Sequence, residues 1–158
     1  MSEILTLIEE DKRPTRRSSS ETGSKGERLA AEFLIREGYR IVMANFTVPI
    51  GRDIRGVQVK GEIDLIALDR EVVCFVEVKT RSSDEFAGPL TAVDVRKQRL
   101  ITRTARVYRR VFSLSDVRYR FDVVTVLDDG RGEPLIELFK AYWTESKFKK
   151  RAWNDELH

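Results

Sequence analysis

Residues 61–81 constrain the fold more than any other stretch, because they are typical of two apolar strands joined by a short polar turn at 69–71. The second strand is apolar on both faces, and such strands lie in the centre of a sheet that is covered on both sides. Yet Asp64 on the first strand and Glu77 and Lys79 on the second are ionisable. Burying such groups without partners costs several kcal/mol. The stretch therefore predicts a functional site on a central hairpin.

Side chains alternate between the two faces of a strand. We therefore expect Asp64 to share a face with Ile66, and Glu77 to share a face with Phe75 and Lys79.

Two helices are predicted around this hairpin. Ser24 and Glu27 have the spacing of a capping box, and Gly38 is a typical residue after a helix end, which predicts a helix over 24–37. An apolar stripe predicts a second helix over 91–112, with Lys97 in the middle of the stripe. A lysine there either extends its amino group to solvent or meets a carboxylate of the sheet.

Alternating apolar residues predict five strands, at about 41–50, 57–68, 71–80, 118–127 and 134–139. Asp122 lies on a largely apolar strand, so we expect it to be structural and paired with a backbone or basic group. With 158 residues the chain is expected to form one domain, over 24–139. A flexible basic arm (1–23) precedes this domain, and a basic, aromatic extension (140–158) follows it.

The composition excludes several kinds of metal site and catalytic site. The single cysteine, Cys74, rules out an internal disulfide and a cysteine-based zinc site, and the single histidine, His158, is the last residue. Histidine metal sites and Ser-His or Cys-His catalysis are thereby excluded. The net charge of +3 permits a polyanionic partner without demanding one. No apolar run approaches the roughly 20 residues that span a bilayer, and no signal peptide is evident, so we expect a cytoplasmic protein.

The candidate metal ligands that remain are carboxylates, so the sequence predicts a metal site with oxygen ligands only. Asp64 and Glu77 come from adjacent antiparallel strands, and carboxylate oxygens suit Mg²⁺ or Mn²⁺. Lys79, two residues after Glu77, is placed to orient an attacking water and to stabilise charge at phosphorus. Glu27 is either a helix cap or a carboxylate aimed at the sheet, and the residues alone leave both interpretations open. The pattern points to metal-dependent phosphodiester hydrolysis.

The chain also carries an ordered series of motifs, namely Gly26-Glu27-x-x-Ala30-Ala31, Gly38-Tyr39, Asn45, Gly61-Glu62-Ile63-Asp64, Glu77-Val78-Lys79-Thr80-Arg81, Lys97 and Arg120-Phe121-Asp122-Val123. In these residues the chain resembles the YraN-like family of uncharacterised bacterial proteins. That family is similar in fold to the restriction-endonuclease-like, PD-(D/E)xK nucleases, which include archaeal Holliday-junction resolvases.

This resemblance implies an α/β fold with an αβββαβ core, in which helices flank a mixed central sheet. It also implies Mg²⁺- or Mn²⁺-dependent cleavage of DNA by Asp64, Glu77 and Lys79, with Glu27 near the metal. Junction resolvases act as dimers, so a homodimer is implied by analogy. The chain departs from the family pattern by extra residues at 46–60, where the family usually makes a short turn, and by both terminal extensions. Substrate preference depends on these departures.

We therefore predict a metal-dependent endonuclease acting on DNA, with branched or structured DNA as a candidate substrate. One alternative is a non-catalytic nucleic-acid-binding protein that retains the nuclease fold. The other is a structural protein whose charges form a buried ion-pair network. The predicted catalytic residues are Asp64, Glu77, Lys79, Glu27 and Lys97, of which Asp64, Glu77 and Glu27 are the metal ligands. The predicted nucleic-acid contacts are Lys97, Arg81, Arg96, Arg99 and Arg103.

Overall fold

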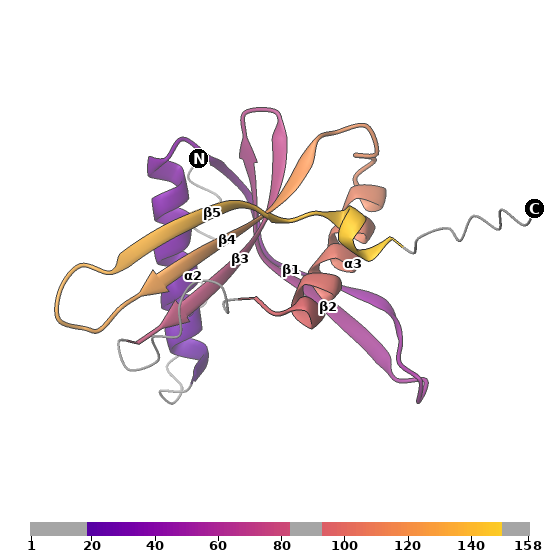
Figure 1. Ribbon diagram of the computed structural model, residues 1–158, viewed down its shortest axis with the longest axis horizontal. Coiled ribbons are helices and arrows are strands. Elements are labelled where there is room, and N and C mark those ends of the chain that lie inside the picture. Colours follow the sequence, from indigo (N-terminus) through magenta and orange to yellow (C-terminus); the bar gives the residue numbers. More distant parts are fainter. Residues whose placement is uncertain (1–18, 83–92, 150–158) are drawn as a thin grey trace, which may run out of the picture.

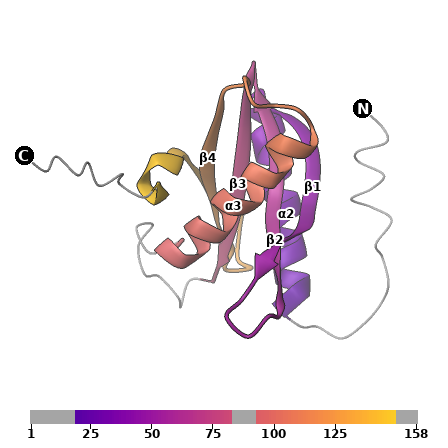
Figure 2. The same cartoon turned by 90° about the vertical axis from the view of Figure 1, so that its right-hand side faces the viewer.

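The computed structural model describes residues 19–82 and 93–149. It is an α/β fold in which one long helix covers each face of a five-stranded mixed sheet (Figures 1 and 2). The elements in chain order are α2 (Ser19–Arg36), β1 (Arg40–Arg52), β2 (Gln58–Asp69), β3 (Val72–Arg81), α3 (Val95–Val111), β4 (Tyr119–Leu127), β5 (Leu135–Trp143) and the 3-10 helix η3 (Glu145–Phe148). This order confirms the predicted αβββαβ core.

The strands lie in the sheet in the order of the chain, β1-β2-β3-β4-β5. Neighbouring strands are antiparallel except for β3 and β4, which are parallel. A parallel pair requires a long crossover connection, and α3 is part of it. On the central strand β3, Cys74 and Phe75 point to opposite faces, and both are fully buried. The prediction of a central strand covered on both sides is confirmed.

Two apolar clusters hold the three layers together. Helix α2 packs Ala30 and Leu34 against one face of the sheet. Helix α3 packs Ile101 and Tyr108 against the other face, where Phe75 lies edge-on to the Tyr108 ring. Figure 2 shows the sheet between the two helices.

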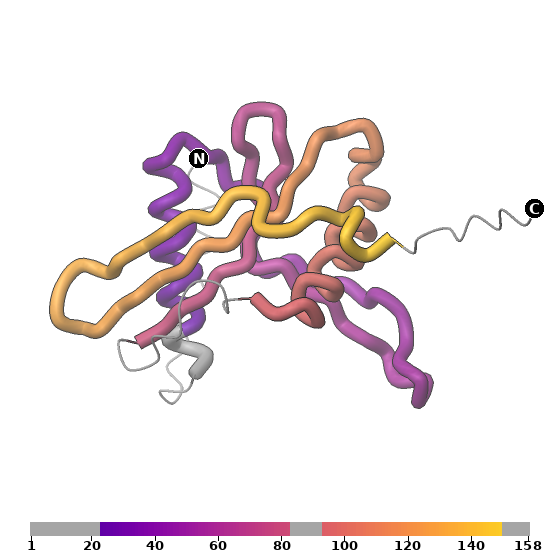
Figure 3. The backbone as a smooth tube through the Cα atoms, viewed as in Figure 1, coloured from indigo at the N-terminus to yellow at the C-terminus, as the bar shows by residue number. Residues whose placement is uncertain are grey.

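Strands β2 and β3 pair over only part of their lengths. Their pairing runs from Asp69↔Val72 to Leu65↔Val76 and stops there. Beyond this point β2 continues as a ribbon with β1, whereas β3 continues beside β4. Figures 1 and 3 show the two arms of the sheet diverging. Asp64 and Glu77 are the first residues past the last pair, one on each arm.

The β1–β2 ribbon is irregular at Asp64. Ile63 and Ile66 both pack in the cluster beneath α3, whereas Leu65 packs beneath α2. Strict alternation, which we expected when we placed Asp64 on the face of Ile66, is therefore interrupted. On β1, Asn45 lies between the partners of Leu65 and Ile63 and has a φ of 52°. Positive φ is uncommon outside glycine, and asparagine is among the residues that tolerate it best.

The predicted start of the first helix is wrong. Helix α2 begins at Ser19, inside the segment expected to be a flexible arm, so Ser24 lies within the helix and is not its N-cap. A capping box permits a helix to begin at its first residue, but it does not prevent the helix from extending further back. Gly26 is also internal, where the helix meets β3: a Cβ at this position would lie 1.8 Å from Thr80 Oγ1.

Two other predicted boundaries shift. Helix α3 begins at Val95 and not at residue 91, because the Asp94 carboxylate accepts a hydrogen bond from the Lys97 N–H (2.8 Å) and caps the helix. Strand β5 continues past residue 139 to Trp143, which is buried and stacks on Phe121 with ring centroids 4.8 Å apart.

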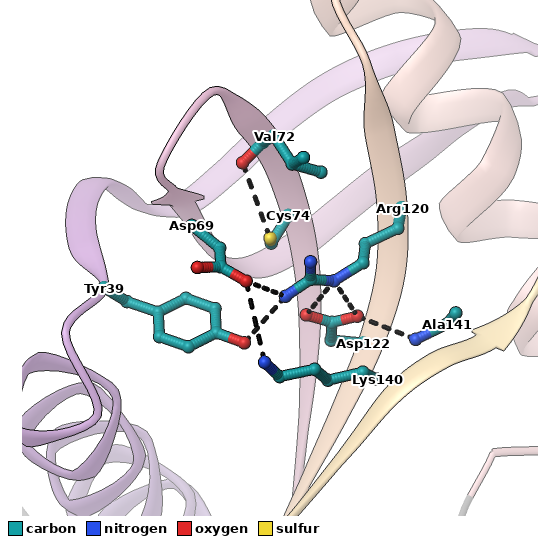
Figure 4. Close-up of polar contacts among 8 residues, drawn as sticks. All are labelled: Tyr39, Asp69, Val72, Cys74, Arg120, Asp122, Lys140 and Ala141. Carbon is teal, nitrogen blue, oxygen red and sulfur yellow. Dashed lines mark hydrogen bonds and ion pairs between the residues drawn. The ribbon is translucent and has the colours of Figure 1, made fainter.

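Asp122 is structural, as predicted (Figure 4). Its carboxylate is fully buried and accepts hydrogen bonds from Arg120 Nε (2.9 and 3.0 Å) and from the Ala141 N–H (2.9 Å). The same guanidinium also donates to Asp69 (2.9 Å) and to the Tyr39 hydroxyl (2.7 Å). Arg120 thereby joins β4 to the end of β2 and to Tyr39 just before β1, whereas Asp122 joins β4 to a bulge in β5, where the β4–β5 register shifts.

Residues 1–18, 83–92 and 150–158 lie outside the described part of the chain, and with them lie most of the expected basic arm and half of the C-terminal extension. Within residues 19–82 and 93–149, no helix is long and apolar enough to cross a membrane.

Candidate active site

Asp64 lies where β2 leaves β3. Its Oδ2 atom accepts a hydrogen bond of 2.8 Å from the Val78 N–H. Val78 lies past the last β2–β3 pair, so this side chain provides the acceptor where the strand ladder has ended. The carboxylate is therefore fixed by the backbone of the strand that carries Glu77 and Lys79.

Glu77 is an acid in an unfavourable environment. Its side chain is only 4% exposed, and Oε1 lies 3.5 Å from the amino group of Lys97 on α3. Oε2 is buried and has no hydrogen-bond partner within the described part of the chain. Burial, the charge of Asp64 and a hydrogen bond that the protonated acid donates to the Asp64 carboxylate raise the pKa of Glu77 to about 8, although Lys97 and Lys79 oppose this rise.

Glu27 reaches the same region from α2. Burial, followed by the charge of Asp64, raises the pKa of Glu27 to about 7, and a hydrogen bond from the Asn45 side chain opposes this rise. Since Ser24 is not a helix cap, the interpretation of Glu27 as half of a capping box is wrong. It is a carboxylate that projects from the helix toward the sheet.

Asn45 was not among the predicted site residues, although it binds Glu27 and lies beside Asp64 in the ribbon. The available signal was an asparagine in the middle of an apolar strand, a position where asparagine is uncommon.

Most of the predicted catalytic side chains line one open cleft of about 440 Å³. Its walls are Gly23, Glu27, Asp64, Glu77, Val78, Lys79 and Thr80. Four of the five predicted catalytic residues therefore share one cleft, and Lys97, the fifth, contacts it through Glu77. A second cavity of about 290 Å³ adjoins the cleft at Thr80, with Lys25, Arg81 and Asp128 in its wall.

The predicted nucleic-acid contacts have different surroundings in the structure. Arg103 donates to the Ile50 carbonyl, and the Arg99 guanidinium lies over the Phe148 ring, 5.6 Å from its centroid. Arg96 is exposed, Arg81 lines the second cavity, and Lys97 pairs with Glu77. Nucleic-acid contact by these residues stays a prediction.

The donor set of the cleft fits a hard cation in its chemistry. Carboxylate oxygens are preferred ligands of Mg²⁺ and Mn²⁺, and the unpartnered Glu77 Oε2 is an oxygen that a cation would satisfy. Among the residues that the structure describes, no three His, Cys, Asp or Glu side chains are positioned to hold an ion by themselves. Mg²⁺ is often bound by only one or two carboxylates, with water and phosphate oxygens as its other ligands.

Comparison with known proteins shows the family to which this chain belongs. A family model described as "Uncharacterised protein family UPF0102" matches residues 26–126, which include Glu27, Asp64, Glu77, Lys79 and Lys97. The chain belongs to the UPF0102 (YraN) family. This confirms the predicted resemblance.

Curated UPF0102 relatives are similar over most of their length. A UPF0102 protein of Chlorobium chlorochromatii is 41% identical over 134 residues, which cover 81% of this chain and 95% of the relative. One from Caldanaerobacter subterraneus subsp. tengcongensis is 42% identical over 104 residues, which cover 66% of this chain and 77% of the relative. A solved structure titled "Crystal structure of SSO0001" matches with a TM-score of 0.37 and 16% identity over 82% of this chain and 56% of that one, too little similarity to support an argument.

Proposed function

We propose that this UPF0102 protein is a metal-dependent endonuclease that hydrolyses phosphodiester bonds in DNA, with branched or structured DNA as its substrate class. The observation that carries the proposal is Glu77, a buried carboxylate with an unpartnered oxygen, beside Asp64 at the point where two strands separate.

The contrast with Asp122 supports a functional role for Glu77. Asp122 is at least as buried, yet both of its oxygens accept hydrogen bonds from Arg120. Such complete satisfaction is usual for a structural carboxylate, because an unsatisfied buried one is costly. Glu77 keeps one oxygen unpaired and has a strongly raised pKa, a combination that is frequent at functional sites.

In this proposal Asp64 and Glu77 hold a Mg²⁺ or Mn²⁺ ion, with Glu27 as a third carboxylate at the edge of the cleft. The bound ion supplies Lewis acidity and lowers the pKa of water. Lys79, in the wall of the same cleft, orients the attacking water and stabilises negative charge on the phosphate oxygens. Lys97 favours the ionised form of Glu77, which is the form that binds a cation.

The test is a cleavage assay with Mg²⁺ or Mn²⁺ on single-stranded, duplex, flap and four-way DNA. We expect cleavage of at least one substrate, lost on adding EDTA and in Lys79→Ala, while Lys79→Ala keeps its DNA affinity. Glu71→Gln, an exposed carboxylate at the other end of the same hairpin, is the matched control and should cleave normally.

Absence of metal-dependent cleavage of every substrate contradicts the proposal. DNA binding by the wild type and by Lys79→Ala, with no cleavage by either protein, supports the non-catalytic alternative. A loss of thermal stability in Lys79→Ala, without any DNA binding by the wild type, supports the ion-pair network.

A further inference from the structure

The β1–β2 hairpin, residues 46–61, projects away from the rest of the sheet (Figures 1 and 3). At its tip, residues 53–57, the Ile54 side chain is fully exposed and that of Val57 is 60% exposed. Single exposed apolar residues are ordinary on protein surfaces. Ile54 differs because hydrogen bonds order the turn that carries it, and because the base of the hairpin is fixed on α3.

The tip satisfies its own polar groups. Asp53 Oδ1 accepts hydrogen bonds from the N–H groups of Arg55 (2.8 Å) and Val57 (2.9 Å). Arg52 Nη1 donates to the Gly56 carbonyl (2.7 Å), and the Asp53 N–H donates to the Val57 carbonyl (2.8 Å). Gly56 has a φ of 78°, which the turn requires. The turn therefore holds Ile54 outward in an ordered backbone, which lowers the entropy lost on binding.

The base of the hairpin is fixed on α3. The Arg103 guanidinium donates to the carbonyl of Ile50, which is itself buried. Gly61 packs so closely that an added Cβ would lie 2.1 Å from Thr104 Oγ1. Because α3 also carries Lys97, the partner of Glu77, the hairpin and the cleft share one rigid support.

The hairpin is also positively charged. Arg52, Arg55 and Lys60 are exposed, and Asp53 and Glu62 are the acidic residues near them. The Arg55 side chain is 83% exposed, and its Nε lies 3.9 Å from Asp53 Oδ2, a long contact that leaves most of the guanidinium accessible. Basic residues around an apolar apex are the combination by which proteins grip phosphates and insert an aliphatic wedge between base steps. A two-stranded ribbon also has the width to enter a DNA groove.

We propose that the tip of this hairpin inserts Ile54 into the base stack of a DNA duplex arm, with Arg52, Arg55 and Lys60 on the flanking phosphates. The position of the wedge relative to the cut rests on the proposed function. Six residues separate Asp64 from Gln58 along β2, a span of about 20 Å. Ile54 lies beyond Gln58 in the tip, so the wedge is at least about 20 Å from Asp64 along the ribbon.

This geometry favours one substrate class. Separating two stacked base pairs costs a few kcal/mol, and the cost is lowest where stacking is already broken. A duplex arm that has a mismatch or a branch point under the hairpin tip meets that condition.

The wedge is tested without catalysis, in EDTA, by titrating the full-length protein into branched DNA that carries 2-aminopurine at successive positions. We expect a fluorescence gain at one or two adjacent positions. Ile54→Ser should abolish the gain and weaken binding about tenfold, since the loss is that of a buried aliphatic side chain. Leu135→Ser, which alters an exposed apolar residue at the start of β5, is the matched control and should do neither.

Equal fluorescence gains for wild type and Ile54→Ser, or no binding to DNA, overturn the wedge. A position-specific gain that depends on Ile54, in a protein that never cleaves DNA with Mg²⁺ or Mn²⁺, upholds the wedge and contradicts only the nuclease. Metal-dependent cleavage with no Ile54-dependent gain contradicts only the wedge.

Discussion

The carboxylate of Asp64 accepts a hydrogen bond from the Val78 N–H across the gap where β2 leaves β3, at 2.8 Å. This contact joins Asp64, a candidate metal ligand on β2, to the backbone of β3. Val78 lies between Glu77, the other candidate ligand, and Lys79, the candidate catalytic lysine. Asp64 therefore has a structural role and a chemical role, and substitutions can separate the two.

Asp64→Asn should separate them. An asparagine oxygen still accepts the Val78 N–H but carries no charge for a cation. We expect the melting temperature to stay within about 2 °C of the wild type and cleavage to fall by at least about a hundredfold. Asp64→Ala should lose cleavage and also about 1 kcal/mol of stability, because the N–H loses its acceptor. Equal destabilisation by both variants would show that the hydrogen bond does not hold this part of the sheet.

The metal-free protein should lose stability as pH rises from about 5 to about 8.5. The folded protein holds the pKa of Glu77 at about 8 and that of Glu27 at about 7, both above the ordinary 4.5. The folded state therefore binds more protons in this window, and its stability declines as these groups ionise. Thermal melts in EDTA across this range measure the effect.

Glu77→Gln should remove the part of that pH dependence that Glu77 contributes, because glutamine does not titrate, and leave the smaller part that Glu27 contributes. Glu71→Gln, on the exposed turn, should leave it unchanged. A wild-type protein whose stability is constant from about pH 5 to 8.5 is incompatible with the raised pKa values.

Lys97→Met should shift the pH–rate profile of cleavage to higher pH by about one unit. The amino group of Lys97 lies 3.5 Å from Glu77 Oε1 and lowers the pKa of that carboxyl, so its removal keeps Glu77 protonated to higher pH. Lys97→Arg should restore most of the profile. Arg110→Met, at an exposed position in the last turn of the same helix, serves as the control. An unchanged profile in Lys97→Met would mean that the ion pair does not tune Glu77.

Gly26→Ala should destabilise the fold by about 1–3 kcal/mol, because the new methyl group collides with Thr80 and pushes α2 away from β3. Thr80→Ala in the same chain should recover part of the loss. Gly23→Ala, three residues earlier in α2, is the matched control: within the described residues nothing lies within 4 Å of its Cβ. It should stabilise the helix by about 0.5–1 kcal/mol. Chemical denaturation of the wild type and the three variants decides whether this close approach exists.

The fold was predictable where local pattern and tertiary packing agree. The apolar runs around Leu65 and Phe75 identify central strands, because only a strand buried on both faces is apolar at every position. The start of α2 was not predictable from Ser24, since a cap signal does not exclude a longer helix. Ala141 has a φ of 51° within β5, and the bulge is stabilised by Asp122, a contact between distant residues that no local pattern reveals.

The candidate site was predictable for a related reason. Charged residues on apolar strands stand out, so Asp64, Glu77 and Lys79 were identified, and the structure brings them to one cleft. Asn45 was missed because its role depends on a left-handed backbone that the sequence only permits. Arg103 was predicted to contact nucleic acid, which stays a prediction. Its hydrogen bond to Ile50 was not predictable, because that bond depends on a hairpin whose length and direction are set by packing.

The most direct test of the central claim, that Asp64 and Glu77 form a divalent-cation site, is titration of the purified protein with Mn²⁺ followed by electron paramagnetic resonance. It needs no knowledge of the preferred DNA. We predict saturable Mn²⁺ binding that tightens between about pH 6 and 8, as Glu77 ionises, and that is lost in Asp64→Asn and Glu77→Gln but kept in Glu71→Gln. Mn²⁺ binding that is equally strong in all four proteins would contradict the account.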